Sequence, residues 1–224
     1  MKREDFKKLL EDCGQRYSTV LGIDVSGGKD EEIFKWFLAS ILFGAPITES
    51  SVIKTYKCFQ KHGVLTPQKI LETGWDGLVK ILDEGSYTRY DFKTADKLLL
   101  VMQNLTEKYH GSLSAVHGRA SDERDLESRL KSLGKGIGDV TVSIFLRELR
   151  GVWQKADPKP TALVILAAEE LGLVKEQATA EETLKQLKTF WKRNAVAGMS
   201  FINFETALFR VGRDLRGKAR SEGS

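Results

Sequence analysis

Helical periodicity of the apolar residues constrains this chain more than any other feature. Apolar side chains recur at the spacing of one helix face through most of the sequence, and no segment alternates convincingly between apolar and polar residues as a half-buried strand does. The patterns cover residues 4–15, 31–43, 49–62, 67–72, 75–82, 91–109, 125–133, 139–150, 161–171, 180–194 and 200–212. We therefore predict an all-α protein.

A short glycine-rich link joins the pattern at 125–133 to the one at 139–150. Its residues are Gly134, Lys135, Gly136, Ile137 and Gly138. Such a link is short enough to require a tight turn between antiparallel helices, and its glycines permit positive φ angles. The N–H groups that begin the second helix have no acceptor within that helix, so they suit a phosphate. The bland alternative is a helix corner that binds nothing.

Asp157 opens the sequence Asp-Pro-Lys-Pro, which precedes the apolar pattern at 161–171. This order is typical of an N-cap aspartate followed by proline at the first helical position. If Asp157 is the cap, the third helical residue is Pro160, which has no N–H to donate, and much of the carboxylate stays free. A fixed carboxylate stabilises the positive charge that develops when an N-glycosidic bond breaks.

Together these features resemble the endonuclease III-like superfamily of helix-hairpin-helix DNA glycosylases. The resemblance covers about residues 30 to 172 and is carried by Leu133, Gly134, Lys135, Gly136, Ile137, Gly138, Thr141 and Asp157, with looser matches at Gly85, Tyr87, Lys93 and Ala95. It implies two helical lobes with a cleft between them. Residues 31–150 would form a six-helix lobe ending in the helix-hairpin-helix, and residues 1–30 with 151–224 would form the second lobe.

The same resemblance implies roles for individual residues. The hairpin residues 134–138, Thr141 and Tyr87 would contact DNA, and Asp157 would lie at the mouth of the base pocket as the catalytic group. Tyr87 is equally compatible with packing on its neighbours. Phe43 and Trp153 are candidates for the base pocket, although aromatic residues in such positions more often belong to a core.

One position distinguishes two mechanisms. Bifunctional members of the family carry a lysine two positions after the last hairpin glycine, and here Val140 occupies that position. The resemblance therefore implies a monofunctional enzyme in which Asp157 assists attack by water. A displaced lysine at Lys135 or Lys159 would instead give a bifunctional glycosylase and AP lyase.

Asp139 follows the hairpin directly, and its negative charge opposes phosphate binding there. Two other classes of function consequently stay open: a non-catalytic helix-hairpin-helix DNA-binding protein, and an all-α interaction protein. The sequence does not indicate which base would be excised. An alkylated purine needs only a stacking pocket and one aspartate, whereas uracil, a mismatched thymine or an oxidised purine needs edge contacts.

Composition limits the cofactors and partners. The net charge of +4 and isoelectric point near 8.9 are mildly favourable for nucleic acid. Two cysteines cannot hold an iron–sulfur cluster, and the three histidines lack metal-ligand spacing. We expect no cofactor, apart from a monovalent cation that the hairpin could hold. There is no membrane span or signal peptide in the pattern. We expect an intracellular monomer that binds double-stranded DNA containing a damaged or mismatched base.

Overall fold

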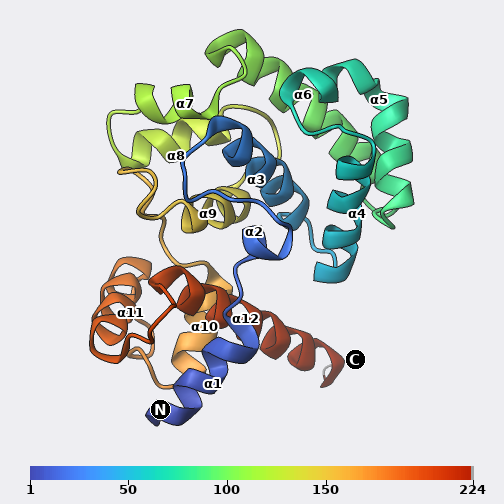
Figure 1. The fold of residues 1–224 in the computed structure, drawn as a ribbon. Coiled ribbons are helices and arrows are strands. Elements are labelled where there is room, and N and C mark those ends of the chain that lie inside the picture. Colours follow the sequence, from blue (N-terminus) through green and yellow to red (C-terminus); the bar gives the residue numbers. More distant parts are fainter. Residues whose placement is uncertain (223–224) are drawn as a thin grey trace. The chain divides into compact units, whose positions relative to one another are not determined.

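The prediction of an all-α protein is confirmed by the computed structural model, which describes residues 1–222 (Figure 1). Twelve α-helices and no strand occur in this part of the chain. The helices form two compact units. Unit 1 contains Met1–Val20 and the residues from Lys159 onward, and unit 2 is Leu21–Pro158. From the sequence we expect the divisions after residues 30 and 150.

Unit 2 is built around a central apolar helix. Its helices are α3 (Asp30–Phe43), α4 (Glu49–Lys61), α5 (Pro67–Glu84), α6 (Asp91–Tyr109), α7 (Leu113–Arg119), α8 (Glu123–Lys131) and α9 (Asp139–Glu148). Helix α3 packs against α4, α7 and α9, and it is apolar on nearly every side, as a buried helix must be. The indole of Trp36 on α3 donates to the carbonyl of Phe145 on α9 at 3.0 Å, so the two helices are tied by a buried hydrogen bond.

Two features of unit 2 differ from the expected helices. Residues 67–72 and 75–82 belong to one element, α5, which is broken at Gly74 by a φ angle of 66°. Helix α7 has no counterpart among the predicted patterns, because its seven residues are too few to show a helical period. The short α2 (Tyr17–Val20) of unit 1 is missed for the same reason.

Unit 1 joins the beginning of the chain to its last helices. Besides α2 it contains α1 (Arg3–Cys13), α10 (Ala162–Glu170), α11 (Ala180–Asn194) and α12 (Phe201–Glu222). Helix α12 packs against both α1 and α10 (Figure 1). Phe6 of α1 contacts Phe190 of α11 and Phe204 of α12 edge to face, with ring centroids 5.1 and 5.2 Å apart, so aromatic side chains form the centre of this unit. Across residues 1–222, no helix is long and apolar enough to cross a membrane.

Candidate functional site

Two positions of the turn between α8 and α9 require glycine, one because of its backbone angle and the other because a neighbouring side chain lies too close. Gly136 has a φ angle of 93°, which glycine adopts without strain. A Cβ at Gly134 would lie 2.6 Å from Cγ2 of Val101 on α6, which is too close. Gly138 differs, because its φ of −104° is ordinary and a Cβ there would meet nothing within 4 Å. Gly134 and Gly136 therefore shape the turn, and Gly138 is dispensable to it.

Ile137 is buried and holds the turn in place, so the DNA contact predicted for it cannot come from its side chain. Its amide donates to the carbonyl of Gly134 at 3.1 Å, and its side chain is buried. Lys135 next to it is exposed. The turn thus presents glycine backbone and one lysine to solvent, and it uses the isoleucine to anchor itself.

Helix α9 begins with two exposed side chains. Asp139 is 89% exposed and forms an ion pair with Lys131 at the end of α8. Val140 is 50% exposed. The amides of this first helical turn have no acceptor within the helix. Because Lys131 offsets the charge of Asp139, the start of α9 repels an anion less than the sequence alone implies.

Lys97 of α6 lies across the turn and is the feature that sequence reasoning missed. A Cβ at Gly136 would be 2.7 Å from Cε of Lys97 and 3.4 Å from Nζ. The side chain is half-buried, and this burial lowers the pKa of its ammonium group. Within residues 1–222 its amine has no carboxylate partner. Nothing in the local sequence marks Lys97, because it meets the turn only through the packing of α6.

The expected N-cap role of Asp157 is wrong. Helix α10 begins at Ala162, and its cap is Thr161, whose side chain accepts from the amide of Val164 at 3.5 Å. Asp157 lies further upstream, in a non-helical segment, and pairs with Arg150. A threonine directly before the helix can reach the free amides of the first turn, and Asp157 is left to a different partner.

The Arg150–Asp157 pair is asymmetric in its exposure. The Arg150 side chain is only 9% exposed, whereas that of Asp157 is 31% exposed. Arg150 also donates through Nη2 to the carbonyl of Pro158 at 2.5 Å. A nearly buried guanidinium therefore fixes both the carboxylate and the backbone beside it, and part of the carboxylate still reaches solvent.

The predicted DNA contacts of Thr141 and Tyr87 require correction, because both side chains are buried. Thr141 is 3% exposed and faces Gly44, where a Cβ would lie 2.2 Å from its Oγ1. Tyr87 is fully buried and donates its hydroxyl to the carbonyl of Leu42 at 2.6 Å. Both residues hold α3 in place, and neither side chain is available to a ligand at the surface.

The two candidates for a base pocket also differ. Trp153 is buried between His117, on which it stacks with ring centroids 4.7 Å apart, and Phe145, which it meets edge to face at 5.6 Å. Phe43 is half-buried, with its ring 6.4 Å from that of Trp36. Trp153 is thus a core residue of unit 2, and Phe43 keeps some exposed surface.

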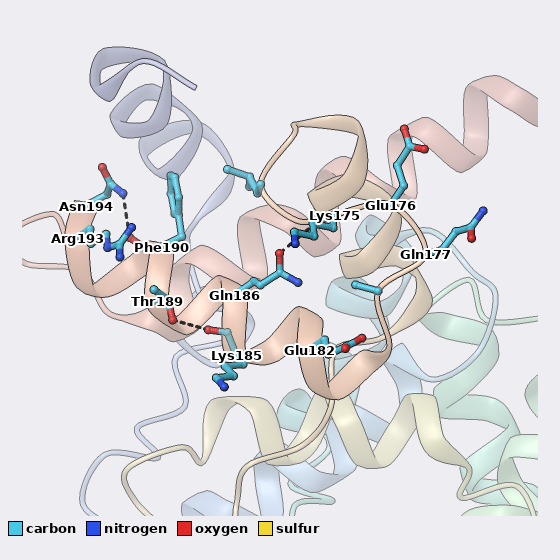
Figure 2. A pocket seen from close by; sticks show the side chains of 12 residues that line it. Lys175, Glu176, Gln177, Glu182, Lys185, Gln186, Thr189, Phe190, Arg193 and Asn194 are labelled. Atoms are coloured by element: carbon cyan, nitrogen blue, oxygen red, sulfur yellow. Dashed lines mark hydrogen bonds between the residues drawn. The ribbon is translucent and has the colours of Figure 1, made fainter.

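Each unit contains a hollow. In unit 2 a hollow of about 470 Å³ is lined by Asp122, Glu123, Arg124, Gln154 and Lys155. In unit 1 a groove of about 730 Å³ runs along α11, and Figure 2 shows its side chains. The groove is lined by Leu173, Lys175, Glu176, Gln177, Ala178, Glu182, Lys185, Gln186, Thr189, Phe190, Arg193 and Asn194. Neither hollow contains a predicted site residue.

Metal ligands and known relatives give no further assignment. Over the part of the chain that is described, no three His, Cys, Asp or Glu residues are grouped so as to hold a metal ion. Neither Cys13 nor Cys58 forms a disulfide within the described residues. No family model, curated protein or solved structure matches this chain.

Proposed function

We propose that this protein is a DNA glycosylase that hydrolyses the N-glycosidic bond of a flipped damaged or mismatched base in double-stranded DNA. The observation that carries the proposal is the Asp157 carboxylate, which a nearly buried arginine fixes while leaving it partly exposed. It stands at the position where the glycosylase resemblance expects the catalytic aspartate. The proposal thus joins a sequence pattern to a carboxylate that is held in place.

Hydrolysis of the N-glycosidic bond requires a fixed negative charge beside the sugar. As the bond to the base lengthens, the sugar gains positive charge, and a carboxylate held beside it stabilises that charge without reorganising. The guanidinium of Arg150 pairs with the Asp157 carboxylate and holds it in one orientation. Asp157 would also accept a hydrogen bond from the attacking water. The base leaves and an intact abasic site remains.

The α8–α9 turn supplies the proposed grip on DNA. The backbone amides that begin α9 suit a phosphate, and Lys97 and Lys135 add positive charge beside them. These contacts involve the sugar–phosphate chain only, so they position the strand without selecting a sequence. Recognition of the damaged base would have to come from other groups.

A monofunctional mechanism is favoured over a lyase. Val140 is exposed at the start of α9 and provides no amine there. Of the two lysines that could replace it, Lys159 already pairs its amine with the carboxylate of Glu181. Lys135 is the remaining candidate for an amine that attacks the sugar.

A non-catalytic DNA-binding protein is the second candidate function. It is favoured by the same ion pair, because Arg150 already offsets the charge of Asp157. In that case the carboxylate would only anchor the segment between α9 and α10. The turn would bind phosphates in either case.

The test is a panel of duplexes that each carry an alkylated purine, uracil, a mismatched thymine or an oxidised purine. Incubation followed by hot alkali should break the strand at the lesion for at least one duplex, and without alkali the strand should stay intact.

Borohydride captures imine intermediates and should not trap the wild type, whereas Val140→Lys should gain weak trapping on an abasic duplex. DNA binding without release of any base would favour the non-catalytic function. Trapping of the wild type would make Lys135 the first suspect for a lyase.

A further inference from the structure

Exposed apolar side chains gather on one part of unit 2. Six large apolar residues are exposed among residues 1–222, and three of them, Trp75, Phe92 and Leu100, lie on α5 and α6. These two helices pack along each other (Figure 1). Phe92 is 57% exposed, more than any of the others. Exposed apolar side chains that lie together indicate a binding surface, whereas single exposed apolar side chains are common on any protein.

Direct contacts connect this cluster to the α8–α9 turn. The rings of Trp75 and Phe92 lie 5.2 Å apart, and the indole N–H of Trp75 donates to Asp96 at 2.9 Å. Lys97, the residue after Asp96 on α6, lies against Gly136, and Leu100 comes within 3.6 Å of a Cβ at Gly134. We call Trp75, Phe92, Asp96, Lys97 and Leu100 the α6 strip. It extends about 12 Å from Phe92 to Leu100, given the rise of an α-helix.

We propose that the α6 strip binds unpaired nucleotides of the strand held by the α8–α9 turn, with Trp75 and Phe92 stacking on bases and Lys97 facing a phosphate. A cationic side chain beside exposed aromatic rings is the combination that single-stranded nucleic acid binds. The proposal rests on the proposed function for the DNA at the turn. It adds a preference for DNA with a single-stranded segment next to a duplex.

The charges of the strip favour nucleic acid over a protein partner. Lys97 lies between Phe92 and Leu100, and no carboxylate pairs with its amine within the described residues. Interfaces between proteins are depleted of charge at their centre, so an amine without a counter-ion would be costly there. A phosphate supplies that counter-ion. Asp96 accepts from Trp75 and forms no ion pair with Lys97 within the described residues.

The same hydrogen bond prepares Trp75 for stacking. With its N–H already bonded to Asp96, the indole has no polar group left to satisfy and is held in one orientation. The negative charges of Asp91 and Asp96 lie beside Phe92, so attraction to phosphates is weak at this end of the strip. The aromatic end should therefore contribute through stacking, and the Lys97 end through charge.

Fluorescence anisotropy can test the two ends separately, with a blunt duplex and with the same duplex extended by a single-stranded overhang. The wild type should bind the overhang duplex more tightly. Phe92→Ala and Trp75→Ala should each lower affinity for the overhang duplex by roughly fivefold or more and leave its salt dependence unchanged. Lys97→Met should reduce the slope of log affinity against log salt by about 0.7. Leu166→Ala, which removes an equally exposed apolar side chain from α10, is the matched control and should bind as the wild type does.

Two further variants separate stacking from folding and from apolar contact. Trp75→Phe keeps a ring and should retain most of the affinity, which a folding defect would not allow. Phe92→Leu keeps an apolar surface without a ring and should bind as weakly as Phe92→Ala. Equal affinity of the wild type for blunt and overhang duplexes, or unchanged binding by both alanine variants, would overturn the proposal. An overhang preference without base release would support the strip and refute the glycosylase, whereas base release without that preference would do the opposite.

Discussion

The α8–α9 turn and the segment between Arg150 and Thr161 were equally conspicuous in the sequence, but they depend on different kinds of information. The turn is defined by its own backbone, through the positive φ of Gly136 and the hydrogen bond from Ile137 to Gly134. The conformation of the segment depends on how its polar side chains pair. The Thr161 side chain caps α10, and Arg150 forms an ion pair with Asp157. Backbone requirements can be read from residue types, whereas a choice among polar partners is made by the fold.

The largest expected effect on stability distinguishes two glycines of the turn. Gly136→Val places a β-branched residue at positive φ and against Lys97, so it should lower the free energy of unfolding by roughly 2–3 kcal/mol. Gly138→Val should have a much smaller effect, since its φ is ordinary and its surroundings are open. Urea denaturation of both variants measures the difference. Equal losses would mean that Gly138 also shapes the turn.

The next effect compares an ion pair in each region. A double-mutant cycle with Arg150→Met and Asp157→Asn should give a coupling energy of roughly 1–2 kcal/mol, because Arg150 is nearly buried. The cycle with Lys131→Met and Asp139→Asn should give no more than about 0.5 kcal/mol, since that pair is exposed and screened by water. Both cycles can be measured by denaturation. A stronger coupling at the turn would reverse the contrast between the regions.

The identity of the α10 cap gives a smaller effect. Thr161→Ala removes the acceptor for the Val164 amide and should cost about 1 kcal/mol of unfolding free energy. Thr161→Ser keeps the hydroxyl and should restore most of that loss. If Thr161→Ala were neutral in thermal and chemical unfolding, the Thr161 hydroxyl would not be the cap of α10.

The smallest effect is a pH dependence near the segment. Burial and then the nearby Lys155 ammonium lower the pKa of His117, which stacks on Trp153. The unfolded chain consequently takes up this proton at higher pH than the folded protein, and stability falls as the pH drops below about 6.5. Unfolding free energies measured at about pH 7.5 and about pH 5.5 should differ less for His117→Phe than for the wild type. An unchanged difference would exclude His117 as its source.

Much of the fold could be predicted because the apolar residues of a long amphipathic helix recur at the helical period. The bounds of α11 were predicted without error, and those of α4 to within one residue. Short helices such as α7 could not be predicted, since seven residues make fewer than two helical turns and show no period. Gly74 shows the intermediate case, where two expected helices turned out to be one helix with a break.

The candidate site was harder to predict because burial depends on contacts that are distant in sequence. Tyr87 was given two equal interpretations, and its hydrogen bond to Leu42, far away along the chain, makes it a core residue. Lys97 had no signal of its own, because only the packing of α6 brings it to Gly136. Residue type alone could nominate Asp157, but it could not reveal Arg150 as its partner.

The most direct test of the account is single-turnover base release by Asp157→Asn, on whichever lesion duplex the wild type cleaves. Loss of a fixed charge that is needed only in the transition state should reduce the rate by about 10²–10³ while DNA binding stays equal or tightens. Asp12→Asn, a substitution at an exposed aspartate of α1, is the control and should react as the wild type does. Full base release by a folded Asp157→Asn would remove Asp157 from the mechanism and contradict the account at its centre.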